Sequence, residues 1–409
     1  MQGLYLQNNN FSGEIPACVF TDFPKLWILR ASNNQLGVWC LVLDLSGNHI
    51  TGNIPQMICS LASIEILDIS NNNLTGPIPR CNSASLASLN LYGNSLSGDI
   101  SDDLFNTSNL MYFDMRHNKL TGNLSWLGHL DNIKTISLGW NGFEGQITPD
   151  LCKLKCPRII DFSHNKLSGS LPPCVGNISC ESDTAQNPSL FLLFYIIIEA
   201  YISVYDPIDF TFTTKGGQYT YGLNFFNLMS GIDLSGNMLS GEIPWELGNL
   251  SHIKSVNLSN NFFTGQIPAS FANMSEIESL DLSNNLLSGS IPWQLTRLSS
   301  LAVFSVAYNN LSGCIPNSGQ FGSFSMDSYQ GNNNLHNMSE GNKCSPGNKG
   351  AGNLPSEGRD SMTDDPVLYA VSAASFVLAS WATVAFLFFH PLGRSVILAS
   401  GNMVLWSGH

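Results

Sequence analysis

The side chains of this 409-residue chain with the clearest capacity for chemistry are cysteines and N-x-S/T asparagines, ten of each. Cysteines pair as disulfides in oxidising compartments, and the N-x-S/T pattern accepts N-linked glycans in secreted proteins. Together they predict a secreted glycoprotein, although repetition of the sequence alone could also multiply such asparagines. The asparagines are Asn10, Asn73, Asn106, Asn123, Asn177, Asn249, Asn257, Asn273, Asn310 and Asn337.

Motifs for catalysis are missing from the sequence. It contains no GxxxxGK[ST], HExxH, HRD or DFG segment. Cys152 and Cys156 form a C-x3-C pair, which is not a zinc pattern without further ligands. We therefore expect no enzymatic activity, no cofactor and no metal site.

The charge of the chain excludes a further class of function. Only 11% of the residues are charged, and the net charge is −13. A protein that binds nucleic acid normally carries a basic patch that neutralises phosphates. We therefore expect no nucleic-acid partner.

A repeat of the form LxLxxNxLxGxIP must position these side chains, and residues 280–292 show it in full. In the last four copies its asparagine recurs every 24 residues. This period is typical of leucine-rich repeats. We predict an α/β-type leucine-rich repeat solenoid of mostly strand and irregular coil, with a parallel sheet on its concave face. The anchor asparagines are Asn9, Asn34, Asn48, Asn72, Asn94, Asn118, Asn141, Asn165, Asn237, Asn261, Asn285 and Asn309.

Each part of the repeat has a physical role. The LxL segment alternates at the period of a strand, so one set of side chains points inward and the other lies on the sheet face. The asparagine is expected to be buried, and it then needs backbone partners in neighbouring coils. The glycine permits a bend, and the Ile-Pro step favours extended chain.

Two spacings break the period. Asn34 and Asn48 are only 14 residues apart, which indicates a deletion within one coil. Asn165 and Asn237 are 72 residues apart, and no recognisable repeat precedes Ile232. We interpret residues 174–229 as an island, that is, an insertion between two coils.

Cysteines at matching positions of neighbouring coils should pair. Neighbouring coils stack about 4.8 Å apart, which lies within the Cα separations of disulfides. The positions relative to the anchor asparagines predict the bridges Cys59–Cys81, Cys152–Cys174 and Cys156–Cys180. Cys18 would find its partner only in a coil upstream of Met1, so we expect the chain to be truncated at its N-terminus.

An apolar run without charges, residues 367–389, follows the repeats. Its helix would be about 34 Å long, enough to cross a hydrocarbon core of about 30 Å. We predict one C-terminal transmembrane helix with the repeats outside, since acidic residues precede it and Arg394 follows it. The predicted order is 1–173 first repeat block, 174–229 island, 230–316 last four repeats, 317–345 C-terminal cap, 346–366 acidic linker, 367–389 transmembrane helix and 390–409 cytoplasmic tail.

Binding residues are expected on the concave face, at the variable positions beside the leucines. The coils that end at Asn94, Asn118 and Asn141 carry aromatic and arginine side chains there, which are enriched in binding hot spots. The alternative is that they are solvated residues without a partner. The candidates are Tyr92, Tyr112, Asp114, Arg116, His117 and Trp140.

Nearly the whole chain resembles the plant leucine-rich repeat receptor-like proteins, which are cell-surface receptors without a kinase domain. The resemblance rests on the LSGxIP repeats, the island before the last four repeats, the run from Phe212 to Ser235, and the cap segments Gly319-Gln320-Phe321 and Ser328-Tyr329-Gln330-Gly331-Asn332. The chain departs from the family where it starts within a repeat and where residues 367–389 lack a GxxxG face. It also has His336 where the family carries a cysteine, so we expect Cys344 to lack its usual partner.

The resemblance implies that Lys215 and Tyr221 of the island contact a ligand or co-receptor, although they could instead pack the island against the solenoid. It implies an extracellular peptide or protein ligand, adaptor and co-receptor leucine-rich repeat kinases, and a membrane as partners. The implied location is the plasma membrane, single-pass, with extracellular repeats if a signal peptide lies upstream. The hypothesis is a signalling receptor in defence or development, and the alternative is a non-signalling truncated binding module or decoy.

Overall fold

A computed structural model describes residues 3–5, 12–13, 28–30, 42–56, 58, 64–80, 85–100, 109–178, 210–214, 217–221, 229–337 and 344. The chain divides into two compact units, Met1–Ser345 and Pro346–His409, and all described residues belong to the first. The predicted transmembrane segment, residues 367–389, lies outside them. Within the described part of the chain, no helix is both long and apolar enough to span a bilayer.

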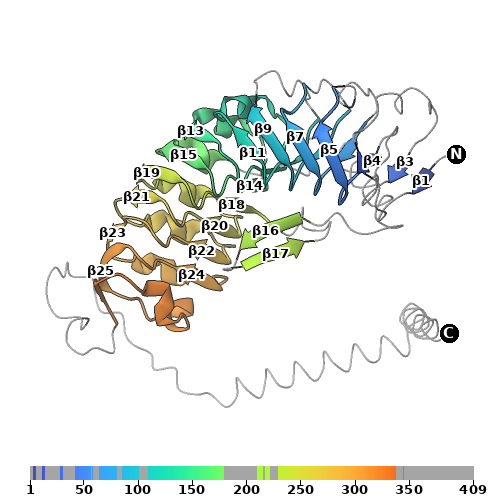
Figure 1. The fold of residues 1–409 in the computed structure, drawn as a ribbon. Helices are drawn as coiled ribbons and strands as arrows, with labels where there is room; N and C mark the ends of the chain where they lie inside the picture. Colours follow the sequence, from blue (N-terminus) through green and yellow to red (C-terminus); the bar gives the residue numbers. More distant parts are fainter. Residues whose placement is uncertain are drawn as a thin grey trace, which may run out of the picture. The chain divides into compact units, whose positions relative to one another are not determined.

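The main element is a 12-stranded sheet to which each coil adds one short strand (Figure 1). Equivalent residues of neighbouring coils pair in parallel register, as Phe113 does with Ile136. One strand precedes each of the twelve predicted anchor asparagines, which confirms the predicted solenoid and its parallel sheet. In order across the sheet the strands are β1 (Gly3–Tyr5), β3 (Ile28–Arg30), β4 (Val42–Asp44), β6 (Ile66–Asp68), β8 (Ser88–Asn90), β10 (Tyr112–Asp114), β12 (Thr135–Ser137), β14 (Ile159–Asp161), β18 (Gly231–Asp233), β20 (Ser255–Asn257), β22 (Ser279–Asp281) and β24 (Val303–Ser305).

The two irregular spacings leave this sheet continuous. Across the 14-residue step, β3 and β4 pair directly through Ile28 and Val42. Across the island, β14 pairs with β18 through Ile160 and Ile232. The sheet face therefore continues past both interruptions.

The anchor asparagines bond the backbones of adjacent coils, as their burial required. The Nδ2 of Asn72 donates to the carbonyls of Ile69 and Ser70 in its own turn and to that of Leu45 in the preceding coil, at 3.2, 3.0 and 2.9 Å. Its Oδ1 accepts from the Ile50 amide at 3.0 Å. Asn332 of the cap is an equivalent anchor that the repeat pattern did not identify: its Nδ2 donates to the carbonyls of Tyr329 in its own turn and Val306 in the last coil, and its Oδ1 accepts from the Leu311 amide.

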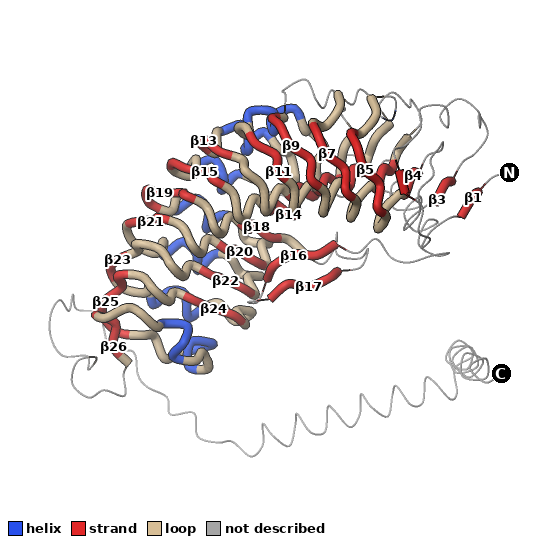
Figure 2. The backbone as a smooth tube through the Cα atoms, viewed as in Figure 1, coloured by secondary structure: helices blue, strands red, loops and turns tan. Residues whose placement is uncertain are grey.

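Short strands and 3-10 helices complete the coils on the return side (Figure 2). The strands form three small sheets: β2 (Ser12–Gly13), β5 (His49–Asn53), β7 (Asn73–Gly76), β9 (Ser95–Asp99) and β11 (Lys119–Thr121); β13 (Glu144–Gln146), β15 (Lys166–Gly169), β19 (Met238–Glu242) and β21 (Phe262–Thr264); and β23 (Ser288–Gly289), β25 (Asn310–Cys314) and β26 (Asn334–His336). The helices are η3 (Ser125–His129), η4 (Pro149–Lys153), η5 (Pro173–Asn177), η6 (Trp245–Asn249), η7 (Ala269–Asn273), η8 (Trp293–Arg297), η9 (Gly319–Gly322) and η10 (Met326–Tyr329).

The repeat's apolar residues form one core inside the coils. In the coil that matches the repeat in full, Leu280, Leu282, Leu287 and Ile291 are all buried. Larger rings fill the core of the middle coils, where Phe113 and Trp126 meet edge to face with centroids 6.2 Å apart. Burial of this core is the main source of the fold's stability.

Disulfides tie the coils at two described places. Cys152 and Cys174 are bonded with their Cα atoms 5.9 Å apart, which confirms that predicted bridge. Cys156 is also disulfide-bonded, while its predicted partner Cys180, together with Cys59 and Cys81, lies outside the described residues. Cys344 lacks a cysteine partner at position 336, as expected, and it pairs instead with Cys314 of the last coil.

The island contributes a β-hairpin, β16 (Phe210–Thr214) with β17 (Gly217–Tyr221), joined antiparallel. Phe212 is fully buried, and its ring lies against Gly231 of β18, where a Cβ atom would come within 2.6 Å of the ring. The predicted island boundary at residue 174 falls within η5, which still packs on η6. The hairpin is thus attached to the main sheet at its first strand after the island.

Candidate binding surface

The six candidate residues lie on three neighbouring coils of the main sheet, in or just after β8, β10 and β12. The structure divides them into two groups. Tyr112, Asp114 and Arg116 are only 3%, 1% and 6% exposed. Tyr92, His117 and Trp140 lie just beyond the carboxyl ends of these strands, where the chain turns, and Trp140 is 50% exposed.

The buried group is an ion pair with a phenol beside it. The Arg116 guanidinium donates from Nε to both carboxylate oxygens of Asp114 at 3.0 and 3.1 Å, and its second nitrogen lies 2.5 Å from Oδ2. Burial alone would lower the pKa of Arg116, but the Asp114 carboxylate raises it above its usual value. The Tyr112 hydroxyl donates to Asp114 at 3.4 Å, and burial followed by the Asp114 charge raises the pKa of Tyr112. This group stabilises the sheet face. The charges of Arg116 and Asp114 are paired with each other and are not available to a ligand.

The second group, together with His164, is a stack of rings that we call the column: Tyr92, which is half-buried, and His117, Trp140 and His164, which are exposed. Tyr92 meets His117 edge to face, with centroids 5.4 Å apart. His117 stacks on Trp140 at 5.4 Å and 11°, and Trp140 stacks on His164 at 3.9 Å and 21°. The Arg116 guanidinium also lies over the Tyr92 ring at 5.4 Å.

The column stands at a turn with left-handed backbone. His117, Trp140 and His164 have φ of 54°, 58° and 50°, and each directly precedes an anchor asparagine. Most other described coils have glycine or asparagine at this position: Gly47, Asn71, Gly93, Gly236, Asn260 and Asn284, with Tyr308 in the last coil. Histidine tolerates this backbone conformation much as asparagine does, whereas the bulky Trp140 is disfavoured there, and such local strain is concentrated at functional sites.

His164 was not among the predicted residues, although the sequence contains a signal for it. His164 occupies the same place before Asn165 as His117 does before Asn118 and Trp140 before Asn141. Reading the residue before each anchor asparagine as one row would have found it. The three rings belong together because equivalent residues of adjacent coils are neighbours.

Both imidazoles of the column are biased toward the neutral form. Burial and then the Arg116 charge lower the pKa of His117, against an opposing effect of Asp114 and Asp161. Burial lowers the pKa of His164, against an opposing effect of Asp161. At neutral pH the column therefore carries no charge of its own.

Two pairs of adjacent carboxyl groups lie in another row of the sheet face. Asp44 and Asp68 are register partners, as are Asp161 and Asp233. Burial and then the neighbouring Asp44 charge raise the pKa of Asp68 to about 7. In the same way, burial and the Asp161 charge raise the pKa of Asp233 to about 7. Sequence reasoning missed these pairs because the aspartate belongs to the ordinary repeat text.

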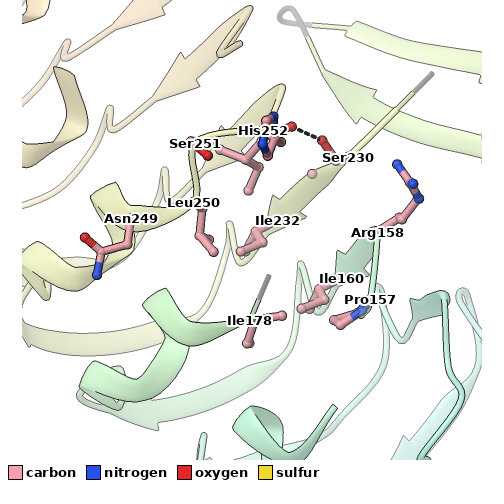
Figure 3. Close-up of a pocket in the computed structure, with 12 residues that line it drawn as sticks. Pro157, Arg158, Ile160, Ile178, Ser230, Ile232, Asn249, Leu250, Ser251 and His252 are labelled. Carbon is pink, nitrogen blue, oxygen red and sulfur yellow. Dashed lines mark hydrogen bonds between the residues drawn. The ribbon is translucent and has the colours of Figure 1, made fainter. Parts of the chain in front are cut away.

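A small pocket lies where the coil before the island meets the coil after it (Figure 3). Ile160 and Ile178 line one side, and Ile232 and Leu250 line the other. The Ser230 hydroxyl donates to the His252 carbonyl at 2.7 Å near its rim. This pocket was not predicted, because the repeat pattern does not describe how the coil before the island meets the coil after it.

The island candidates are described only in part. Lys215 lies outside the described residues. Tyr221 pairs with Phe210 in the hairpin. Tyr219 of the same strand is 45% exposed. Their contact with a ligand or co-receptor stays a prediction, and among the described residues no cluster of three or more histidine, cysteine or acidic side chains could hold a metal ion.

Most described N-x-S/T asparagines are exposed: Asn73, Asn123, Asn177, Asn249, Asn273 and Asn310, with Asn337 half-buried and Asn10 and Asn106 outside the described residues. Asn257 differs, because it lies in β20 on the face of the main sheet. Its Nδ2 donates to Asp233 at 3.2 Å, and its Oδ1 accepts from the Ser259 amide and hydroxyl at 3.1 and 2.8 Å.

We expect Asn257 to be bare in folded, secreted protein. A glycan there would project from the sheet face and displace the Asp233 contact, so glycosylated chains should fold poorly. Asn249, exposed at the end of η6, should carry glycan in the same sample. Mass spectrometry after glycosidase release in heavy-oxygen water measures both sites. Full occupancy at Asn257 would contradict this placement.

The comparisons with known proteins concern these repeats. Profiles described as leucine rich repeat match residues 251–311, and 40–61, 63–83, 85–107, 157–178 and 230–250. No protein of curated function matches the sequence. The chain is a leucine-rich repeat protein.

Its solved structural neighbours include plant receptor ectodomains. The chain is similar to a TDR receptor, with 26% identity, a TM-score of 0.59, and coverage of 78% of this chain and 44% of that one. It is similar to the plant peptide hormone receptor RGFR1 in complex with RGF2, with 26% identity, a TM-score of 0.58, and coverage of 82% and 50%. The chain thus spans about half the length of these receptors. The repeat solenoid of this chain is thus similar to those of plant receptors.

A plant ice-binding protein is also similar, with 25% identity, a TM-score of 0.52, and coverage of 72% of this chain and 80% of that one. The same solenoid therefore occurs in receptors and in a protein with a different task. A function for this chain must be argued from its own surface residues.

Proposed function

We propose that this chain is the ligand-binding part of a cell-surface receptor-like protein, and that it binds an extracellular peptide or protein at the column. One observation carries the proposal: three successive coils place His117, Trp140 and His164 at a left-handed position where most other described coils have glycine or asparagine. The similar receptor RGFR1 was solved with RGF2, which supports a ligand of this kind.

The buried ion pair supports this placement of the site. Arg116 is held by its ion pair with Asp114 and lies over the ring of Tyr92, so it supports the first ring of the column. Aromatic residues on a rigid support are typical anchors of binding hot spots. The Phe212 contact with Gly231 holds the island hairpin on the same sheet, where Tyr219 would add a second contact surface.

The remaining parts of the proposal rest on the resemblance to receptor-like proteins. Signalling would pass through adaptor and co-receptor leucine-rich repeat kinases at the plasma membrane, in defence or development. A non-signalling binding module or decoy would share the column but associate with no kinase. Co-purification of the full chain from membranes with and without kinases distinguishes these two functions.

The ligand proposal is tested with the full chain, produced behind a secretion signal, against a defined panel of synthetic secreted plant peptides. Trp140→Ala should weaken binding of any peptide hit by roughly 10- to 100-fold, because a hot-spot aromatic contributes about 1.5–3 kcal/mol. Trp293→Ala is the matched control, since Trp293 is 62% exposed at the start of η8 and should not matter. Equal binding by wild type and Trp140→Ala would overturn the proposal.

A further inference from the structure

The column presents ring edges rather than ring faces to solvent. Trp140 has His117 on one face and His164 on the other, with interplanar angles of 11° and 21°. Because Trp140 is nevertheless 50% exposed, its accessible surface is mainly its rim. A ligand therefore cannot stack on the indole, and it must meet the edges of the rings.

Both ends of the column are closed as well. Tyr92 covers the outer side of His117 in an edge-to-face contact. At the other end, His164 lies against Gly236, where a Cβ atom would come within 2.7 Å of Nδ1. The rim is thus the surface that the column offers to a partner. Aromatic rims carry positive partial charge and the ring N–H donors, so they favour an anionic partner.

The charges around the column decide when an anion can bind. Arg116 and Asp114 of β10 neutralise each other in their ion pair. Asp161 of β14 acts on both imidazoles. Asp233 of β18, next to Asp161, holds its proton up to a pH of about 7. With neutral imidazoles the surroundings are negative, and protonation of both histidines makes them positive.

We propose that the rim of the column binds carboxylate groups of the ligand, and that it does so in acidic but not in neutral solution. This inference rests on the proposed function and names the chemistry of its ligand. Each protonated imidazole carries a full positive charge and donates a hydrogen bond to the carboxylate. Such charge-assisted hydrogen bonds are about twice as strong as neutral ones. The carboxylate could belong to an acidic side chain or to a peptide C-terminus.

The chain itself supplies suitable variants. Asn71, Asn260 and Asn284 occupy the same left-handed position in other coils. His117→Asn and His164→Asn should therefore fold normally, because asparagine is the more usual residue at this backbone conformation. They remove the titrating ring while they keep the turn.

The experiment follows the two imidazoles by NMR of the full chain labelled with carbon-13 in histidine. The probes are acetyl-Gly-Glu-Gly-amide, acetyl-Gly-Gly-Gly with a free C-terminus, and acetyl-Gly-Gln-Gly-amide as the neutral control. Both carboxylate probes should shift the His117 and His164 signals at pH 5 and bind at least 10-fold more weakly at pH 7.5. By linkage, they should also raise the pKa of both histidines. If only one of the two carboxylate probes shifts the histidine signals, that probe identifies whether the column binds an acidic side chain or a peptide C-terminus.

Three results would overturn the inference: equal binding of the neutral probe, equal binding at both pH values, or retained binding by the His117→Asn/His164→Asn double variant. These outcomes are separable from failure of the proposed function. If Trp140→Ala abolishes binding of a peptide hit while carboxylate and pH have no influence, the column is a ligand site and only its chemistry was misjudged. If Trp140→Ala has no effect either, both proposals fail.

Discussion

Replacing Arg116 by alanine should destabilise the solenoid by about 3–5 kcal/mol, because it leaves the Asp114 carboxylate buried without its partner. Asp114 is 1% exposed, and the guanidinium makes the shortest contact of its Oδ2, while its Oδ1 accepts at 3.0 Å from both the Arg116 Nε and the Arg116 backbone amide. From the sequence, Arg116 was a candidate binding residue on the concave face. Its burial makes it unsuitable for a test of binding, and the exposed rings of the column are the better target.

A double variant tests whether the loss of stability comes from the unpaired Asp114 charge. Arg116→Met with Asp114→Leu replaces the ion pair by apolar groups, and this should recover most of the lost stability, since such replacements are often neutral or favourable. Urea unfolding followed by circular dichroism measures the free energy of unfolding of each variant. An Arg116→Ala variant as stable as wild type would show that Asp114 finds water or another donor.

The repeat pattern was sufficient to predict the solenoid because its chemistry is local and periodic. Leu280 and Leu282 are buried because they point into the core of their own coil. The anchor asparagine, such as Asn72, is buried because its side chain hydrogen-bonds the backbone of the neighbouring coil. The same periodicity predicted the Cys152–Cys174 bridge. Properties that recur in every coil can be inferred from one coil.

Properties that depend on several different coils could not be inferred in this way. Whether Tyr112 and Arg116 are exposed depends on what surrounds them on the sheet face, and the repeat does not contain that information. The Cys314–Cys344 bridge joins the last coil to the segment after it, where no period applies. His164 belongs with His117 and Trp140 only when the residue before the anchor asparagine is compared between coils, because a single coil does not show which residues adjoin it.

The two raised carboxyl pKa values predict a dependence of stability on pH. Asp68 and Asp233 have pKa values of about 7 in the folded protein, against 3.8 as the usual value. A group whose pKa is raised by folding stabilises the fold fully below pH 3.8, and this contribution is lost as the pH rises through 7. The two column histidines act in the opposite direction, since their lowered pKa values remove stability as the pH falls below 6.5.

Differences between variants separate these opposing effects. Relative to wild type, Asp233→Asn should gain on the order of 3 kcal/mol of stability between pH 4.5 and pH 7.5, because asparagine stays neutral throughout. Asp68→Asn should behave alike, since Asp44 stands beside it as Asp161 stands beside Asp233. Asp281→Asn is the matched control, because Asp281 has the same place in its coil but its register partners are Asn257 and Ser305. Urea unfolding at half-unit pH steps measures all three, and parallel curves for Asp233→Asn and Asp281→Asn would rule out the paired-carboxyl explanation.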